Sequence, residues 1–138
     1  MTKKIGSYLL LLKLKYDSKI NIGKLGKFDF KKGHYIYVGS ALNGLDNRIE
    51  RHLRKEKKLH WHIDYFLTKA NAIEIFYKEG KDKEECNIAG EFQKNFSIIP
   101  GFGCSDCSCK SHLLYGEYEE IKKLISGLNM SKYLNEKY

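Results

Sequence analysis

The chain has 138 residues, of which 42% are hydrophobic, 13% aromatic and 30% charged, and its formal net charge is +8. This length favours one compact domain over residues 1–138, and the apolar content is sufficient for a core, which argues against disorder of the whole chain. No apolar run approaches the roughly 20 residues that span a bilayer, and the first residues lack the features of a signal peptide, so we expect a cytoplasmic protein without a membrane partner.

Several segments alternate between apolar and polar side chains with the period of a β-strand. The longest is Gly6–Tyr16, whose first half is apolar on both faces and is therefore expected to be central. Ile20–Leu25 predicts a weaker strand, and the β-branched and aromatic run Tyr35–Val38 predicts another. Because these three segments are close in sequence, the simplest sheet is an antiparallel meander of about three core strands. Ala72–Tyr77 and His112–Tyr115 predict further short strands.

Helical periodicity appears between and after these strands. It predicts helices over Asn43–Lys58, Trp61–Thr68 and Lys83–Phe96, and a C-terminal amphipathic helix over residues 117–136. A cysteine-rich loop over residues 100–112 separates the last two helices. The expected fold class is therefore α+β, with a small antiparallel β-sheet of about three core strands flanked by helices.

One ordered set of motifs carries the functional prediction. Gly6-Ser7-Tyr8 lies on the first predicted strand, and Tyr37-Val38-Gly39 lies on a later one. A small-residue loop, Ser40-Ala41, follows, and the next helix carries Arg48 and, one turn later, His52. Each motif is weak alone, but the set and its spacing resemble the GIY-YIG nuclease superfamily.

Three further segments narrow this resemblance to the stand-alone domains of the Uri-type branch. They are Gly33–Ala41, His60–Tyr65 and the stretch from Pro100–Gly103 to His112. The similarity extends over nearly the whole chain up to about Tyr115. It implies a GIY-YIG-like fold and a metal-dependent endonuclease that hydrolyses phosphodiester bonds, with DNA as the expected substrate.

The residue types fit the chemistry that the resemblance implies. The planar guanidinium of Arg48 matches the oxygens of a phosphate. The resemblance implies that Tyr8 or Tyr37 positions or deprotonates the attacking water, which requires a nearby cation to lower the pKa of the hydroxyl. Without the resemblance, both tyrosines are ordinary strand residues. His52 can orient Arg48 or contact the substrate, or it can be a structural histidine on the inward face.

The superfamily also implies a glutamate on a helix that holds Mg²⁺ or Mn²⁺. Glu85 shares a helical face with the apolar side chains of Ala89 and Phe92, whereas Glu91 lies among polar residues. A carboxylate on a core-facing stripe is costly unless it is paired or bound to a cation, so periodicity favours Glu85. Glu91 remains the alternative, because its spacing to Pro100 is more typical of other superfamily members.

Thiols and a histidine cluster late in the chain. Cys104, Cys107, Cys109 and His112 could surround Zn²⁺, and Cys86 could replace Cys104 if its helix packs on the loop. Two alternatives stay open. In the first, the cysteines are reduced thiols that fill small apolar gaps; in the second, they form a disulfide if the source is a hyperthermophile.

A basic run over residues 48–58 begins at the predicted catalytic arginine and can lead phosphates into the site, although such a run is more often a solvated helix face. The excess of lysine along the whole chain weakens any inference from net charge. His60 and Asp64 stand four residues apart and can hydrogen-bond, and Trp61 is expected in the core or at its rim. The residues expected to contact nucleic acid are Ser40, Arg51, Arg54, Lys55, His60 and His62.

Two other functions remain compatible with these patterns. One is a non-catalytic nucleic-acid-binding module that keeps the fold without turnover, because fold alone does not determine function. The other is a zinc-stabilised protein-interaction domain that uses the cysteine loop.

Overall fold

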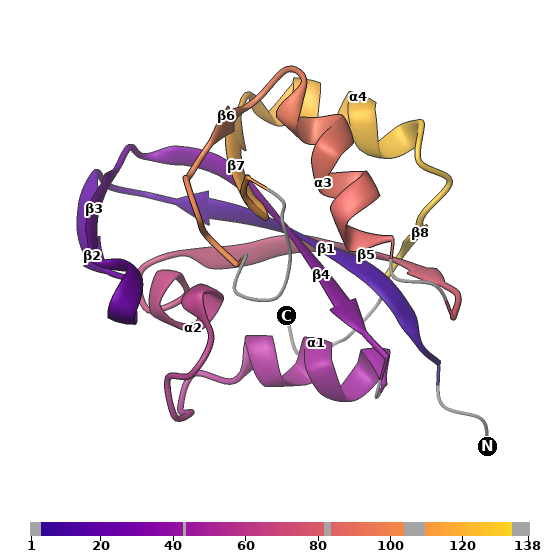
Figure 1. The fold of residues 1–138 in the computed structure, drawn as a ribbon, viewed down its shortest axis with the longest axis horizontal. Coiled ribbons are helices and arrows are strands. Elements are labelled where there is room, and N and C mark those ends of the chain that lie inside the picture. Colours follow the sequence, from indigo (N-terminus) through magenta and orange to yellow (C-terminus); the bar gives the residue numbers. More distant parts are fainter. Residues whose placement is uncertain (1–3, 43, 82–83, 104–109, 134–138) are drawn as a thin grey trace.

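The computed structural model describes residues 4–42, 44–81, 84–103 and 110–133, and an antiparallel β-sheet forms its centre (Figure 1). Within these residues the sheet has six strands in the order β6-β7-β4-β1-β5-β8, and every neighbouring pair is antiparallel. The strands are β1 (Gly6–Leu14), β4 (Gly33–Ala41), β5 (Asn71–Glu79), β6 (Ser97–Ile98), β7 (Leu113–Gly116) and β8 (Ser131–Lys132).

A separate hairpin lies beside the sheet. It consists of β2 (Ser18–Asn21) and β3 (Lys27–Phe30), which are joined by the 3₁₀ helix η1 (Gly23–Leu25). Its inward side chains, Ile20 and Phe30, are buried in the same core as one face of β1. The hairpin therefore extends the core without joining the main sheet.

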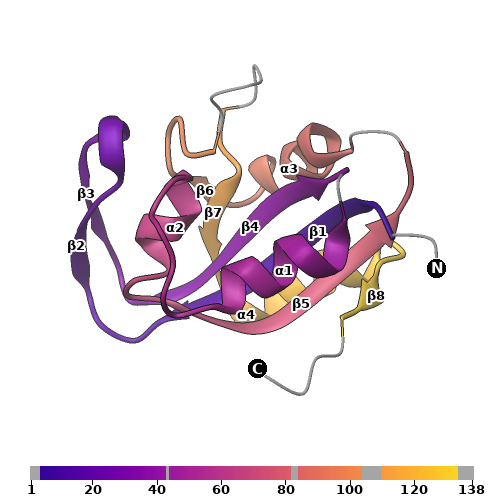
Figure 2. The ribbon, with the colours of Figure 1, turned by 90° about the horizontal axis from the view of Figure 1, so that it is seen from below.

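Helices cover both faces of the sheet, as Figure 1 shows. They are α1 (Leu45–Leu53), α2 (His62–Phe66), α3 (Glu85–Gln93) and α4 (Tyr118–Ser126). The first two pack on one face, and Figure 2 shows α1 running across it; the other two pack on the opposite face. Within the described ranges, none of these helices has both the length and the apolar character needed to cross a bilayer.

The central strand β1 contributes to both hydrophobic cores. Tyr8 and Leu10 pack with α1 and α2, whereas Leu9 and Leu11 pack with α3 and α4. This confirms the prediction that the first half of the strand is covered on both sides, because a strand apolar on both faces needs a layer on each. The burial also explains why β1 occupies the middle of the sheet.

The fold class is α+β, as predicted, but the predicted three-strand meander is wrong. Strand β1 pairs with β4 on one side and with β5 on the other, while β2 and β3 pair with each other. Two short strands with several exposed side chains bury little surface in a central position, whereas β5 offers nine residues and a buried stretch from Glu74 to Phe76. The main sheet is thus larger than expected.

The C-terminal helix is shorter than the predicted range of 117–136. Helix α4 ends at Ser126, Gly127 caps it, and Asn129 adopts a left-handed conformation with φ of 55°. An asparagine tolerates that conformation better than most residues, so the chain leaves the helix there and returns to the sheet as β8. Helix α1 also ends early, at Leu53, rather than continuing to residue 58.

Candidate active site

Three rings from distant parts of the sequence meet on the face of the sheet that α1 covers. The Tyr8 hydroxyl on β1 lies 2.6 Å from Nε2 of His52 on α1, which is hydrogen-bond distance. The ring of Tyr37 on β4 lies 6.4 Å from the ring of Tyr8 and 6.1 Å from that of His52, between centroids. The structure therefore brings the rings of three of the five predicted catalytic residues close together, and two of them share a hydrogen bond.

Burial determines the protonation of these groups. It raises the pKa of Tyr8, and it raises the pKa of Tyr37, where the neighbouring Tyr8 adds to the effect. Burial also lowers the pKa of His52 to about 3, and the charge of Lys57 acts in the same direction. His52 is therefore neutral at ordinary pH, and Nε2 of a neutral imidazole can accept a hydrogen bond from the Tyr8 hydroxyl.

Gly39 makes room for Tyr8. The two residues face each other across β1 and β4, and a Cβ atom on Gly39 would overlap the Tyr8 ring and hydroxyl. Glycine in the Tyr-x-Gly motif therefore has a steric reason, because the ring occupies the space of its missing side chain.

This overlap gives a prediction for Gly39→Ala. Because the ring has to leave its place, we expect the variant to lower the free energy of unfolding by about 1–3 kcal/mol. Gly90→Ala in α3 is the matched control, since an added Cβ there meets no atom within 4 Å. It should be neutral or stabilising by about 0.5–1 kcal/mol, as for glycine replaced by alanine in a helix. Urea unfolding measures both, and an equal effect of the two changes would contradict the packing argument.

Arg48 joins the cluster from α1, one turn before His52. Its Nη1 donates to the backbone oxygen of Ser40 at 3.1 Å, and its guanidinium carbon lies 4.3 Å from the centroid of the Trp61 ring. Burial raises the pKa of Tyr8, and the charge of Arg48 and a hydrogen bond from it partly offset this by lowering the pKa. The arginine thus faces the tyrosine that contacts His52.

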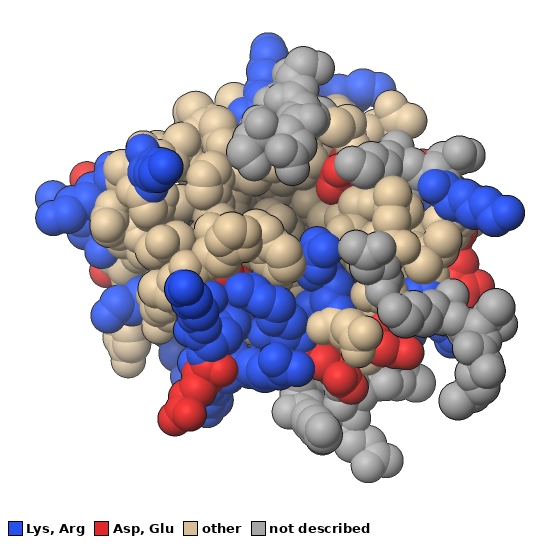
Figure 3. All heavy atoms as spheres, turned by 60° about the horizontal axis from the view of Figure 1, so that its bottom comes forward, with Lys and Arg blue, Asp and Glu red and all other residues tan. Residues whose placement is uncertain are grey.

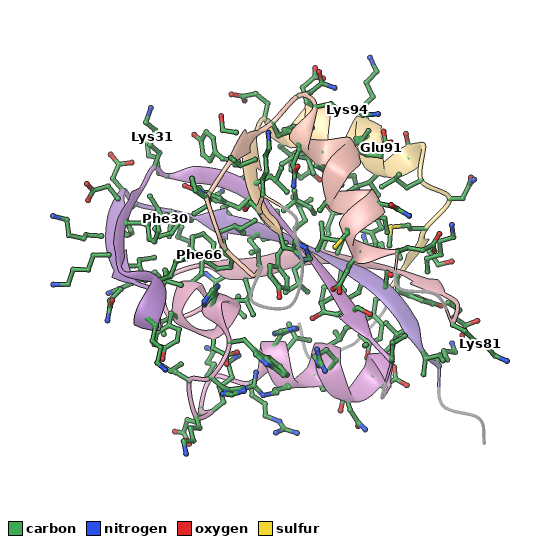
Figure 4. The ribbon with its side chains drawn as sticks, in the orientation of Figure 1. Phe30, Lys31, Phe66, Lys81, Glu91 and Lys94 are labelled. Carbon is green, nitrogen blue, oxygen red and sulfur yellow. The ribbon has the colours of Figure 1, made fainter. Side chains whose placement is uncertain are left out.

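The two candidate glutamates of α3 have different surroundings. Glu85 is half-buried at the start of the helix, and after burial its negative charge is among the causes that raise the pKa of both Tyr8 and Tyr37. Glu91 is exposed and lies 3.2 Å from Lys94, on the part of α3 away from α1 (Figure 4). Glu85 is therefore the member of the pair whose charge acts on the ring cluster.

The predicted zinc ligands are only partly described. Cys104, Cys107 and Cys109 lie outside the described residues. Sγ of Cys86 is 3.8 Å from Nε2 of His112, whose Nδ1 lies 3.2 Å from the Val38 backbone oxygen. Burial lowers the pKa of His112. Within residues 4–42, 44–81, 84–103 and 110–133, no group of three or more His, Cys, Asp or Glu side chains is placed to hold a metal ion.

The residues predicted to contact nucleic acid separate into two groups. Arg54 and Lys55 are exposed at the end of α1, and Figure 3 shows Lys and Arg gathered on that face of the molecule. The backbone oxygen of Ser40 accepts from Arg48, as described, and Nδ1 of His62 accepts the backbone N–H of Gly103 at 2.8 Å. The ring of His62 thereby ties α2 to the start of the cysteine-rich loop.

Arg51 is engaged inside the protein. Its Nη1 and Nη2 lie 2.7 and 2.9 Å from the two carboxylate oxygens of Asp64. The predicted hydrogen bond between His60 and Asp64 is present, but the backbone N–H of His60 donates it, not the imidazole. The backbone N–H of Trp61 also donates to Asp64, just before α2 begins at His62. Sequence patterns did not indicate Asp64 as the partner of Arg51, and the only available signal was the opposite charge of two residues on neighbouring predicted helices.

The environment of Asp64 predicts how stability depends on pH. Burial raises the pKa of Asp64, but hydrogen bonds from Arg51 and from the backbone of His60 and Trp61 outweigh it, so the net pKa lies below the usual 3.8. A carboxyl with a lowered folded-state pKa stabilises the fold above the unfolded-state pKa, and that contribution is lost as the pH falls below about 4. Urea unfolding at pH 5 to 2.5 should therefore show a loss of stability that Asp64→Asn reduces. The exposed Asp29 gives the control, since Asp29→Asn should leave the pH dependence unchanged.

The fold and site define an α+β domain in which tyrosines of an antiparallel sheet meet a histidine and an arginine of the helix that covers it. The chain belongs to the family described as Domain of unknown function DUF123, whose model matches residues 7–132. That range includes every candidate site residue from Tyr8 to His112. No curated protein and no solved structure gives a significant match to the chain.

Proposed function

We propose that this protein is a metal-dependent endonuclease of the GIY-YIG type, which hydrolyses phosphodiester bonds of nucleic acid, with DNA as its substrate. The observation that carries the proposal is the convergence of Tyr8, His52 and Arg48 on one face of the sheet. The charge of Glu85 acts on the same tyrosines. The family description assigns no activity, so the support comes from this geometry and from the similarity of the motifs to the superfamily.

Arg48 is the group that would hold the scissile phosphate. A guanidinium has five N–H donors, and Nη1 of Arg48 uses one for the Ser40 carbonyl, while the Arg48 charge also acts on the Tyr8 hydroxyl. The remaining donors can bind phosphate oxygens in the paired geometry that a planar fork favours. Stabilisation of the charge that develops on phosphorus is the expected contribution.

One of the two tyrosine hydroxyls, of Tyr8 or Tyr37, handles the attacking water. The Tyr8 hydroxyl is oriented by the neutral His52, which leaves its oxygen able to accept a hydrogen bond. Tyr37 is the more exposed of the two and is nearer to solvent. Because burial raises both pKa values, deprotonation of either hydroxyl requires a positive charge in the site.

Glu85 fits the requirement for a cation. Among the described residues, Glu85 and Asp64 are the carboxylates whose charges act on both tyrosines, and Asp64 is already paired with Arg51. Mg²⁺ commonly uses one or two carboxylates and completes its shell with water and phosphate oxygens, so a single half-buried glutamate is a suitable ligand for Mg²⁺ or Mn²⁺. Such an ion, when bound, neutralises charge on the phosphate and favours ionisation of a nearby hydroxyl.

A cleavage assay tests the proposal. Purified protein is incubated with plasmid, branched DNA and RNA in Mg²⁺, in Mn²⁺ and with a chelator, and we expect cutting of DNA that the chelator abolishes. Tight binding without cutting in either metal would instead indicate a nucleic-acid-binding module. Absence of binding, together with stoichiometric zinc by elemental analysis, would indicate a protein-interaction domain.

A further inference from the structure

Asp64 is a fully buried carboxylate with every oxygen in use. Its side chain is 0% exposed, and it accepts both terminal nitrogens of Arg51 at 2.7 and 2.9 Å. It also accepts the backbone N–H groups of His60 at 2.8 Å and Trp61 at 2.9 Å. The carboxylate therefore fixes the start of α2 and the side chain of Arg51 at the same time.

Trp61 connects this pair to the candidate active site. The guanidinium carbon of Arg51 lies 4.2 Å from the centroid of the Trp61 ring, and that of Arg48 lies 4.3 Å from it. The His52 ring is 6.1 Å from the same indole. The indole of Trp61 therefore lies beside both Arg48 and His52, the two α1 residues that face Tyr8.

The charges of the two arginines are used differently. Asp64 neutralises Arg51, and Nη2 of Arg51 makes a further hydrogen bond to the Lys58 backbone oxygen at 3.1 Å. A phosphate that took both terminal nitrogens of Arg51 from Asp64 would leave a fully buried carboxylate without its charge partner, which is costly. Arg48 has no carboxylate partner among the described ion pairs and keeps its charge for an anion.

We propose that Asp64, Arg51 and Trp61 are positioning residues that hold the Arg48 guanidinium for the phosphate, and that Arg51 is not itself a phosphate ligand. This inference rests on the proposed nuclease function. It changes the prediction that Arg51 contacts nucleic acid, and it leaves that role to exposed cations such as Arg54.

Steady-state kinetics at several salt concentrations separate the two roles. Arg51→Lys keeps the charge but not the planar fork, so kcat should fall roughly tenfold to a hundredfold at unchanged KM, as for a small misplacement of a catalytic group. Arg54→Ala, at the residue that caps the same helix, is the matched control and should raise KM and reduce the salt slope by about one. Trp61→Phe keeps an aromatic ring face for the two guanidinium groups and should retain most of the wild-type activity. Trp61→Leu has no ring and should lose that activity, and urea unfolding checks that the two variants are equally stable. A kcat of Arg51→Lys equal to wild type, or a salt slope altered as in Arg54→Ala, would overturn the inference.

A second readout requires no catalysis. Trp61 is the single tryptophan of the chain, so intrinsic fluorescence reports on this indole directly. Arg51→Lys and Asp64→Asn should increase acrylamide quenching of its emission in the folded protein, whereas Arg54→Ala should not. Unchanged quenching in both folded variants refutes the network even in a protein that cuts. If wild type cuts nothing but quenching rises as expected, the nuclease proposal fails and the network stands.

Discussion

Glu85→Gln is expected to lower metal-dependent cleavage by roughly 10³-fold, because the amide keeps the shape of the side chain but not the charge that holds a divalent cation. Glu85 is the α3 carboxylate whose charge raises the pKa of Tyr8 and Tyr37, so the substitution also removes this negative charge from the surroundings of the two hydroxyls. The rate of plasmid cleavage across a Mg²⁺ titration measures the change.

Glu91→Gln is the matched control, since it alters the same helix by the same atoms. Glu91 is exposed and pairs with Lys94, and exposed ion pairs contribute little to stability. Wild-type cleavage is therefore expected. Cutting that survives Glu85→Gln but not Glu91→Gln would assign the metal to the other glutamate and would contradict the choice made from periodicity and surroundings.

Arg48→Ala is the second change with a large expected effect, a loss of about 10²–10³-fold in kcat, comparable with removal of a preorganised donor to a developing oxyanion. Arg48→Lys should recover only part of the rate, because an ammonium group supplies charge without the planar pair of donors. Single-turnover cleavage with excess enzyme separates this effect from weaker binding.

Two controls make the result specific to Arg48. Arg54→Ala removes an equal charge from the exposed end of the same helix, and it should change substrate affinity more than the rate at saturation. Urea unfolding of Arg48→Ala shows whether the lost contact with Trp61 has disturbed the fold. Equal losses of kcat in Arg48→Ala and Arg54→Ala would mean that the basic surface acts only through its total charge.

Most local structure could be predicted from the sequence, and the arrangement of the sheet could not. The alternation in β1 and β5 and the apolar stripe of α1 are local patterns, and each of these elements was expected near its observed place. The pairing of β1 with β5 joins Tyr8 to Tyr77, which are far apart in the chain, and no local pattern specifies such a partner. The meander was the simplest alternative and was wrong for that reason.

The candidate site shows the same division. Helical periodicity placed Glu85 and Glu91 on different faces of one helix, and Glu91 is indeed exposed. The engagement of Arg51 by Asp64 depends on how α1 and α2 lie against each other, which a charge pattern on one helix does not contain. The steric reason for glycine at position 39 likewise depends on the pairing of β1 with β4, which places the Tyr8 ring against it.

Because the Tyr8 ring fills the space of the missing Gly39 side chain, the two positions should vary together during evolution. A relative with alanine in place of Gly39 is expected to carry a smaller residue in place of Tyr8, and a relative that keeps the tyrosine should keep the glycine. The motifs Gly6-Ser7-Tyr8 and Tyr37-Val38-Gly39 are then expected to coevolve, although they lie on separate strands.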